Sequence, residues 1–253
     1  MTGSVGTCSV SRYRDGLMTK GTESVVSEVS LSITLNGSPL MEIACAGIHL
    51  KELALGILYT EGLIESIKDV KEVTISKLPP EAAILTTGEK YPDSATPAIM
   101  SSGALKRRQL PPLPPLTAEP RMTPDGVLSL MERLLSSSTI HDITGGTHCS
   151  ALACKEVIIA LREDIGRHNT IDMCIGYSLL KEQEADNKTI VTTGRISSEI
   201  VAKVWRYGAP MIVSHSAPTS KAIDLADQAG ITLIGYVRNN QMRVYTHERR
   251  VIF

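Results

Sequence analysis

Two similar segments in the second half of the chain place the strongest constraint on its fold. Residues 163–169 read EDIGRHN and residues 193–199 read TGRISSE. Each segment follows an apolar run typical of a buried strand and begins a stretch typical of a helix. Strands that alternate with helices form a parallel sheet with right-handed crossovers. Two such turns therefore meet at one edge of the sheet, where α/β proteins bind their ligands.

The residue types in these two turns are suited to an anionic ligand. Unpaired backbone N–H groups at a helix start attract negative charge, and Arg167 and Arg195 add guanidinium groups that bind phosphate in a bidentate manner. One such turn alone is equally well explained as a capped helix beside a surface arginine, but the repetition favours a binding site. We therefore predict a nucleotide-like phosphate ligand, bound by Asp164, Gly166, Arg167, His168, Asn169, Gly194, Arg195, Ser197 and Ser198.

The composition is that of an ordinary globular protein and excludes several functions. The chain has 253 residues, of which 42% are hydrophobic and 21% charged, and its net charge of -1 gives no broad basic surface for nucleic acids. No apolar run is long enough for a membrane span, and residues 1–10 lack the apolar stretch of a signal peptide. The five cysteines are scattered and odd in number, which favours free thiols in a cytoplasmic protein.

The first third of the chain has the pattern of a small α+β unit. Residues 25–35 alternate between apolar and polar side chains and end at Asn36-Gly37, and residues 40–44 resume the pattern, which is typical of a hairpin with a primed turn. Residues 50–63 carry apolar side chains at helical spacing. Two further strands are expected at residues 70–76 and 82–87. We predict that residues 1–88 form an α+β domain.

Residues 89–122 separate this unit from the rest of the chain. They are rich in proline, with PPLPP at residues 111–115, and show no helix or strand periodicity. Such a stretch is either a linker or a functional loop, and we predict that it is mobile without a ligand. The last domain, residues 123–253, begins with Thr123 as a helix cap and Pro124 at the first helical position.

The predicted order of elements in this last domain resembles the cytidine-deaminase architecture. A helix is followed by two antiparallel strands, at residues 149–154 and 157–161, and then by alternating helices and strands. Zinc deaminases place H-x-E at the start of the helix after the second strand and P-C-x-x-C at the start of the next helix. This chain has His168 in the first place and no cysteine in the second, so a zinc ligand set is missing. We therefore predict a three-layer, cytidine-deaminase-like α/β domain that binds no zinc or other metal.

Several motifs together make the chain similar to the FdhD/NarQ family of formate dehydrogenase accessory sulfurtransferases. Residues 53–64, LALGILYTEGLI, resemble a motif of that family. Further motifs match in the same order, at residues 163–169, 193–199, 216–219 and 233–238. The resemblance extends from about residue 23 to residue 247 and so covers nearly the whole chain.

The resemblance implies a cytoplasmic homodimer that serves formate dehydrogenase. Members of the family receive sulfur from a cysteine desulfurase as a cysteine persulfide and pass it to molybdenum in a bis-molybdopterin guanine dinucleotide cofactor. The cofactor is then inserted into the dehydrogenase, and GDP mimics one of its arms. The resemblance also places part of the cofactor site on a segment near the C-terminus, which here consists of Tyr236, Val237, Arg238, Asn239, Asn240 and Gln241.

The chain departs from the family in the segment that carries the persulfide. The family has a C-x-x-C pair there, whereas this chain has Ser102 and Leu105 in the cysteine positions. A serine hydroxyl cannot form a persulfide, and the thiolate activation that such a pair supplies is missing. Two functions therefore stay open. One is a sulfurtransferase that uses another thiol, with Cys149 as the least poor substitute, and the other is a scaffold that delivers the cofactor without moving sulfur.

Overall fold

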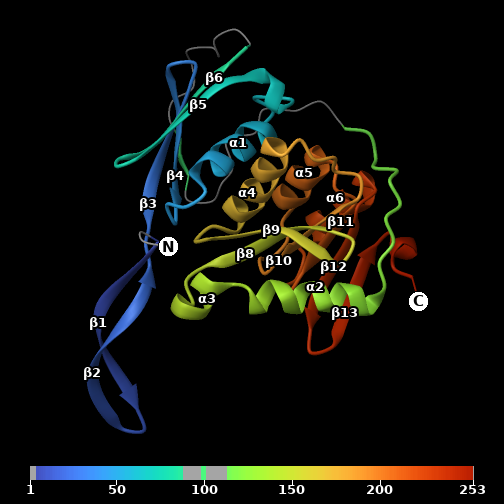
Figure 1. The fold of residues 1–253 in the computed structure, drawn as a ribbon. Helices are drawn as coiled ribbons and strands as arrows, with labels where there is room; N and C mark the ends of the chain where they lie inside the picture. Colours follow the sequence, from blue (N-terminus) through green and yellow to red (C-terminus); the bar gives the residue numbers. More distant parts are fainter. Residues whose placement is uncertain (1–3, 88–97, 101–112, 253) are drawn as a thin grey trace.

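The computed structural model describes residues 4–87, 98–100 and 113–252 (Figure 1). The strands in these residues form three sheets, of two, five and six strands. The chain is thus a mixed α/β protein, which confirms the predicted fold class at that level. Most of the proline-rich segment 89–122, including Ser102 and Leu105, lies outside the described residues. The division of the chain at residues 88 and 122 stays a prediction.

The six-stranded sheet is the centre of the C-terminal part. Its strands lie in the order β13 (Gln241–Thr246), β12 (Thr232–Arg238), β11 (Met211–Ser214), β10 (Lys188–Thr192), β8 (His148–Cys154) and β9 (Val157–Asp164). Strands β10, β11 and β12 are parallel to one another, and the outer pairs are antiparallel. The predicted strand–helix alternation is confirmed, and so is the expected edge where the parallel strands end together.

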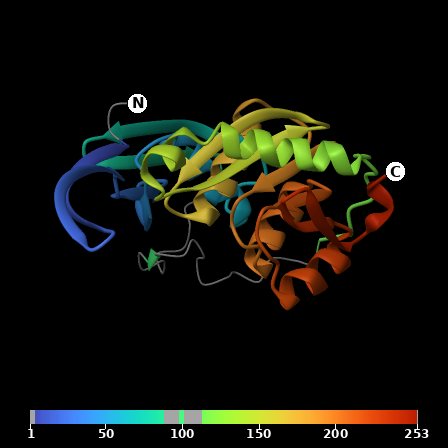
Figure 2. The same ribbon diagram turned by 90° about the horizontal axis from the view of Figure 1, so that it is seen from below.

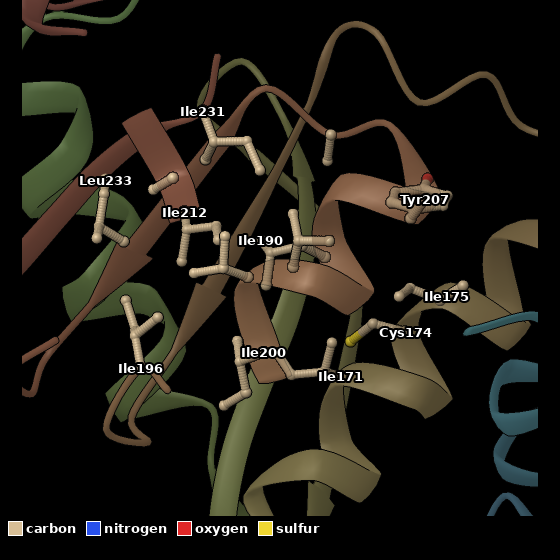
Figure 3. Packing of buried hydrophobic residues seen from close by; sticks show 14 of the residues in the cluster. Ile171, Cys174, Ile175, Ile190, Ile196, Ile200, Tyr207, Ile212, Ile231 and Leu233 are labelled. Carbon is tan, nitrogen blue, oxygen red and sulfur yellow. The ribbon is translucent and has the colours of Figure 1, made fainter. Parts of the chain in front are cut away.

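Helices cover both faces of this sheet (Figure 2). One face packs against α4 (Arg167–Leu180), α5 (Ser198–Tyr207) and α6 (Ser220–Ala229) through an aliphatic core that includes Ile171, Ile190 and Ile212 (Figure 3). The other face is covered by α2 (Pro124–Ser136). This helix begins as predicted, because Thr123 Oγ1 accepts a hydrogen bond of 3.1 Å from the backbone N–H of Gly126. A short helix, α3 (Thr139–Thr144), follows it and was not expected.

The five-stranded sheet lies in the N-terminal part. Its order is β5 (Val70–Lys77), β6 (Pro80–Thr86), β3 (Val29–Leu35), β4 (Ser38–Cys45) and β7 (Ala98–Met100). One face of this sheet packs on α1 (Leu50–Thr60). The described residues also contain two short 3-10 helices, η1 (Ile67–Asp69) before β5 and η2 (Glu248–Arg250) after β13. The predicted hairpin is confirmed, since Asn36 and Gly37 have φ values of 50° and 81°, the left-handed geometry of a primed turn.

Two parts of the N-terminal region differ from the sequence prediction. The strand expected at residues 25–35 is divided between β2 (Leu17–Val26) and β3, and β2 pairs with β1 (Val5–Arg14) in a hairpin that projects from the body (Figure 1). The division arises at residues 27–28, where the chain turns from the hairpin into the sheet. Strand β7 pairs with β4 and lies inside the segment predicted to lack regular structure.

A close crossing of α1 and α4 joins the two parts of the molecule. A Cβ atom on Gly56 would lie 1.9 Å from the backbone oxygen of Asp172, and one on Gly176 would lie 1.9 Å from that of Glu52. Both contacts are with backbone, which cannot rotate away as a side chain can. The crossing at this distance therefore requires glycine in both helices.

Buried ion pairs surround this crossing. Lys203 on α5 donates to Asp172 Oδ2 at 2.6 Å, and Thr60 at the end of α1 donates to Asp172 Oδ1 at 2.8 Å. On the other side, the guanidinium group of Arg162 on β9 forms a two-pronged contact with the carboxylate of Glu52. Such pairs are costly to break when buried, so they fix the orientation of the two parts as well as their contact.

Gly56→Ala should destabilise the protein by at least about 2 kcal/mol, because the added methyl group collides with backbone at the crossing. Urea denaturation should show a lower midpoint with an unchanged slope. Gly6→Ala is the matched control, since its Cβ would meet only a Val25 methyl group at 3.9 Å. A Gly56→Ala protein as stable as the Gly6→Ala protein would contradict the packing described.

Candidate functional site

The two strand-to-helix turns lie against each other at the edge where the parallel strands end. A Cβ atom on Gly194 would lie 2.8 Å from the Cβ of Arg167, so the absence of a side chain at Gly194 allows this contact. The second turn is also tied to its neighbours. The backbone N–H of Cys149 donates to Thr193 Oγ1 at 3.0 Å, and Ser214 Oγ donates to the carbonyl of Gly194 at 2.8 Å.

The ends of β11 and β12 continue the same row. The backbone N–H of His215 donates to the carbonyl of Thr192 at 3.0 Å, and that of Tyr236 donates to the carbonyl of Ser216 at 3.1 Å. The turns after β9, β10, β11 and β12 therefore form one continuous rim. Arg195 lies on this rim with its side chain exposed.

Asp164 and Asn169 connect the first turn to the N-terminal sheet. Asp164 is fully buried, and its carboxylate accepts hydrogen bonds from the backbone N–H of Ala46 at 2.8 Å and of Gly166 at 2.9 Å. Asn169 Nδ2 donates to Asp164 Oδ1 at 2.7 Å and to the carbonyl of Ala44 at 2.9 Å. Burial raises the pKa of Asp164 above its usual value. These contacts position the start of α4 against the N-terminal sheet.

A cavity of about 360 Å³ opens between this turn and the N-terminal sheet. It contains four of the predicted site residues and five others. The lining residues are Glu28, Ile43, Ala44, His148, Ile165, Gly166, Arg167, His168 and Asn169. In the five-stranded sheet, Ile43 is paired with Met100, the last residue of β7. Strand β7 therefore ends beside the strand that forms one wall of the cavity.

Several buried polar atoms at the two turns have no hydrogen-bond partner within the described ranges. They are Arg167 Nε, both ring nitrogens of His168 and Ser197 Oγ. His168 is only 3% exposed and lines the cavity. An unpaired buried polar group costs about 1–3 kcal/mol, so several at one place are typical of a site that pairs them with a ligand. A phosphate-bearing ligand with hydrogen-bonding groups fits this set.

The imidazole of His168 is neutral at physiological pH. Burial lowers its pKa to about 3, and the positive charges of Lys203 and Arg167 act in the same direction. Its Nε2 lies 3.7 Å from Oε2 of Glu199, which is on the first turn of α5. Arg167 and Arg195 form no ion pair with a carboxylate among the described residues. Their positive charges are therefore available to an anionic ligand.

The segment near the C-terminus lies further along the rim and lines other cavities. Tyr236, Arg238, Asn239 and Gln241 border a cavity of about 260 Å³, together with Met242 and Arg243. Val237 and Asn240 border another, of about 370 Å³, on the side of α2. Two strands separate β12 from β8, which corresponds to roughly 15 Å between this segment and the Arg167 cavity.

Tyr236 has an unusual conformation for a residue that carries a side chain. Its φ of 54° lies in the left-handed region, and non-glycine residues held there are frequent at binding sites. The guanidinium groups of Arg243 and Arg238 lie 4.2 Å and 5.2 Å from the centre of its ring. Both guanidinium groups are thus within cation–π distance of the Tyr236 ring.

Sequence reasoning missed several residues of the site. Glu28, Ile43 and Ala44 come from the N-terminal sheet, and no local pattern indicates which strand will face α4. Arg243 could have been found, because it lies two residues after Gln241 on a predicted strand and so shares a face with that predicted site residue. Glu199 belongs to the second sequence motif, but only the structure places its carboxylate beside His168.

Three of the five thiols are unsuited to carry sulfur. Cys45, Cys149 and Cys174 are buried, and burial raises the pKa of Cys45 and Cys149 to about 12 and that of Cys174 as well. Sulfur chemistry requires the thiolate, which is scarce at such pKa values. Cys8, on the projecting hairpin, is exposed, and Cys154 is half-buried.

The described residues contain no group of three or more His, Cys, Asp or Glu side chains that could hold a metal ion. In the same parts of the chain, every helix is too short or too polar to cross a membrane.

The fold and the site together define a class of mixed α/β protein with a polar cavity at the strand ends. The same fold occurs in a crystal structure from Desulfotalea psychrophila, provisionally described as a formate dehydrogenase accessory protein. The TM-score is 0.81, with 23% identity over 98% of this chain and 99% of that chain.

Sequence comparison identifies the family within this class. The chain is 35% identical to the sulfur carrier protein FdhD of Geobacillus kaustophilus, over 96% of this chain and 95% of that protein. It is 36% identical to the protein of the same name from Sulfolobus acidocaldarius, over 96% of each chain. The FdhD/NarQ family model matches residues 26–252. The chain belongs to the FdhD/NarQ family, which confirms the resemblance found in its sequence.

The imidazole of His168 should remain neutral when the pH is lowered from 8 to 5, because its pKa is about 3 rather than the ordinary 6.5. The unfolded chain takes up this proton near pH 6.5, so stability from this group is complete above that pH and declines as the pH falls toward 3. Nitrogen-15 NMR of the ring checks the protonation state, with His168→Gln to assign the signal. Proton uptake by His168 near pH 6.5 would contradict its buried environment.

Proposed function

We propose that this chain is an accessory protein of formate dehydrogenase that binds the molybdenum bis-molybdopterin guanine dinucleotide cofactor as its cargo. One observation carries the proposal, namely the set of unpaired buried polar atoms of Arg167, His168 and Ser197 at adjoining turns of the rim. Membership of the FdhD/NarQ family supports it. The cofactor is a phosphate-bearing molecule of the kind that such turns bind.

The phosphates of the cofactor would lie along the arginines of the rim. Arg167 and Arg195 have no carboxylate partner among the residues described, and the contact of Gly194 with Arg167 brings the two turns together. Arg238 and Arg243, beside Tyr236, add positive charge roughly 15 Å further along the rim. An elongated cofactor with two dinucleotide arms suits two such places better than a single small anion does.

The remaining expectations for this function follow from the family. We propose a cytoplasmic homodimer whose partners are formate dehydrogenase and a cysteine desulfurase. A cytidine-deaminase-like origin of the C-terminal domain, with its zinc site lost, agrees with His168 at the start of α4 and Ser197 and Ser198 before and at the start of α5. No zinc ligand set is part of the proposal.

Sulfur transfer is possible in this chain only through a thiol outside the family's usual segment. In such a transfer the acceptor thiolate attacks the outer sulfur of the donor's persulfide, the donor's S–S bond breaks, and the donor cysteine leaves as a thiolate. Cys8 is the thiol with the exposure to take part, whereas Cys149 is buried and accepts a hydrogen bond of 2.8 Å from Ser138 Oγ. The burial of the other thiols favours delivery of the cofactor without sulfur transfer.

Arg195→Ala should weaken the binding of GDP, used as the mimic of one cofactor arm, by at least about tenfold. The reason is the loss of a charge-assisted contact with phosphate, worth roughly 1.5–3 kcal/mol. Isothermal titration calorimetry provides the measurement. Arg14→Ala, at the end of the projecting hairpin, removes the same charge far from the rim and should leave the affinity unchanged. Equal GDP affinity in the wild-type and Arg195→Ala proteins would refute this phosphate assignment.

Incubation with a cysteine desulfurase and radiolabelled cysteine distinguishes the two forms of the function. Delivery without sulfur transfer predicts no persulfide on any cysteine of this chain. The burial and raised pKa values of Cys45, Cys149 and Cys174 already disfavour a persulfide on those three. Transfer predicts label on Cys8 that disappears in Cys8→Ser. Label that persists in Cys8→Ser would point to Cys154 and would show that exposure does not decide which thiol reacts.

A further inference from the structure

Two helices present matching polar side chains on the faces that meet between them. His168 and Asp172 lie one turn apart on α4, and Glu199 and Lys203 lie one turn apart on α5. They form two successive contacts. The deeper one joins Asp172 to Lys203 at 2.6 Å, and the one nearer the rim joins His168 to Glu199 at 3.7 Å.

The deeper contact is complete. Asp172 and Lys203 are both buried, and Thr60 adds a further hydrogen bond to Asp172. Lys203 donates to both carboxylate oxygens of Asp172, at 2.9 Å and 2.6 Å, and to Thr60 at 3.2 Å. Lys203 also lies 3.7 Å from Oε1 of Glu61, and it forms no ion pair with Glu199.

The contact nearer the rim is incomplete. Neither ring nitrogen of His168 has a hydrogen-bond partner in the described parts of the chain, and the residue is only 3% exposed. Glu199 has no other polar partner there, and its side chain is 39% exposed. Because the imidazole is neutral, the carboxylate remains an uncompensated acceptor next to a cavity-lining residue.

We propose that Glu199 and His168 form a subsite that recognises the 2-amino-4-oxopyrimidine edge shared by guanine and pterin. This inference rests on the proposed function, in which the cargo contains both rings. The edge carries a ring N–H and an amino group side by side, and a carboxylate accepts both in two parallel hydrogen bonds. His168 is placed to pair with a neighbouring polar atom of the ring.

The chemistry of this edge separates it from other bases. Adenine presents a ring acceptor where guanine has its N–H donor, so it would face Glu199 with like polarity. Hypoxanthine keeps the N–H and lacks the amino group, and lumazine differs from pterin in the same group. A site that hydrogen-bonds the amino group should discriminate strongly against ligands without it, because its own polar atoms are then left unpaired.

The sign of the effect of Glu199→Gln distinguishes base recognition from mere proximity to phosphate. If Glu199 binds the ring edge of guanine, the substitution should weaken GDP binding by at least about tenfold and leave IDP binding nearly unchanged, and if it binds the ring edge of pterin, the substitution should weaken pterin binding to the same extent. If Glu199 only lies near the phosphates, removing its negative charge should strengthen the binding of both nucleotides. Glu184→Gln, an exposed position past the far end of α4, controls for the change in net charge.

Calorimetry with GDP, IDP and ADP, and fluorescence titration with pterin and lumazine, test the inference on the full-length chain. The expected result is that wild-type protein binds GDP at least about tenfold more tightly than IDP, or pterin more tightly than lumazine, and that Glu199→Gln removes the difference. The pair that shows the difference identifies the ring. Glu199→Asp, which keeps the charge and shortens the side chain, should also reduce it.

The inference is overturned if neither pair is distinguished, or if Glu199→Gln preserves the distinction or tightens binding of the ligand that carries the amino group in the distinguished pair. These results are separable from a failure of the proposed function. GDP binding that depends on Arg195 but ignores the amino group leaves the cargo site standing and removes only the Glu199 subsite. Wild-type protein that binds neither GDP nor pterin overturns both.

Discussion

The crossing of α1 and α4 is the contact on which the site depends. Gly56 and Gly176 bring the two backbones together, and the buried groups of Asp172, Lys203 and Thr60 fix how the helices are oriented. Helix α1 carries the N-terminal sheet with it, so the crossing also decides where β4 lies relative to the start of α4. The cavity has one wall from each part, and neither part contains it alone. A packing contact between two helices, one turn away from His168, thus sets the geometry of the cavity.

Local patterns in the sequence predicted the elements that bury one face. The β3–β4 hairpin and the helices of the C-terminal part each have a polar and an apolar side, and this contrast gives the periodicity that sequence analysis reads. The β1–β2 hairpin was missed because it projects from the body and most of its residues are exposed, so no face demands apolar residues. The strand β7 is only three residues long and pairs at an edge, where its own pattern carries little information.

The candidate site could be located from sequence, but the division of roles within it could not. Gly-Arg pairs at successive strand-to-helix turns were enough to predict that the turns of Arg167 and Gly194 meet, because parallel strands end at the same edge of a sheet. The sequence around Asp164 is equally consistent with a ligand-binding carboxylate and with one that accepts hydrogen bonds from the backbone. Only the structure shows that Asp164 is buried and accepts hydrogen bonds from the backbone N–H groups of Ala46 and Gly166. The wall from the N-terminal sheet arises from packing between distant segments, which no local pattern encodes.

The residues of the candidate site and the positions of the family's C-x-x-C pair belong to different stretches of the sequence. The rim is built from the turns after β9 to β12, whose geometry is fixed by the central sheet. The segment with Ser102 and Leu105 instead follows β7, at the edge of the other sheet. The proposed binding of phosphate therefore depends on rim residues and not on the two cysteine positions, and among the described residues Arg167 Nε and both ring nitrogens of His168 are buried without a hydrogen-bond partner.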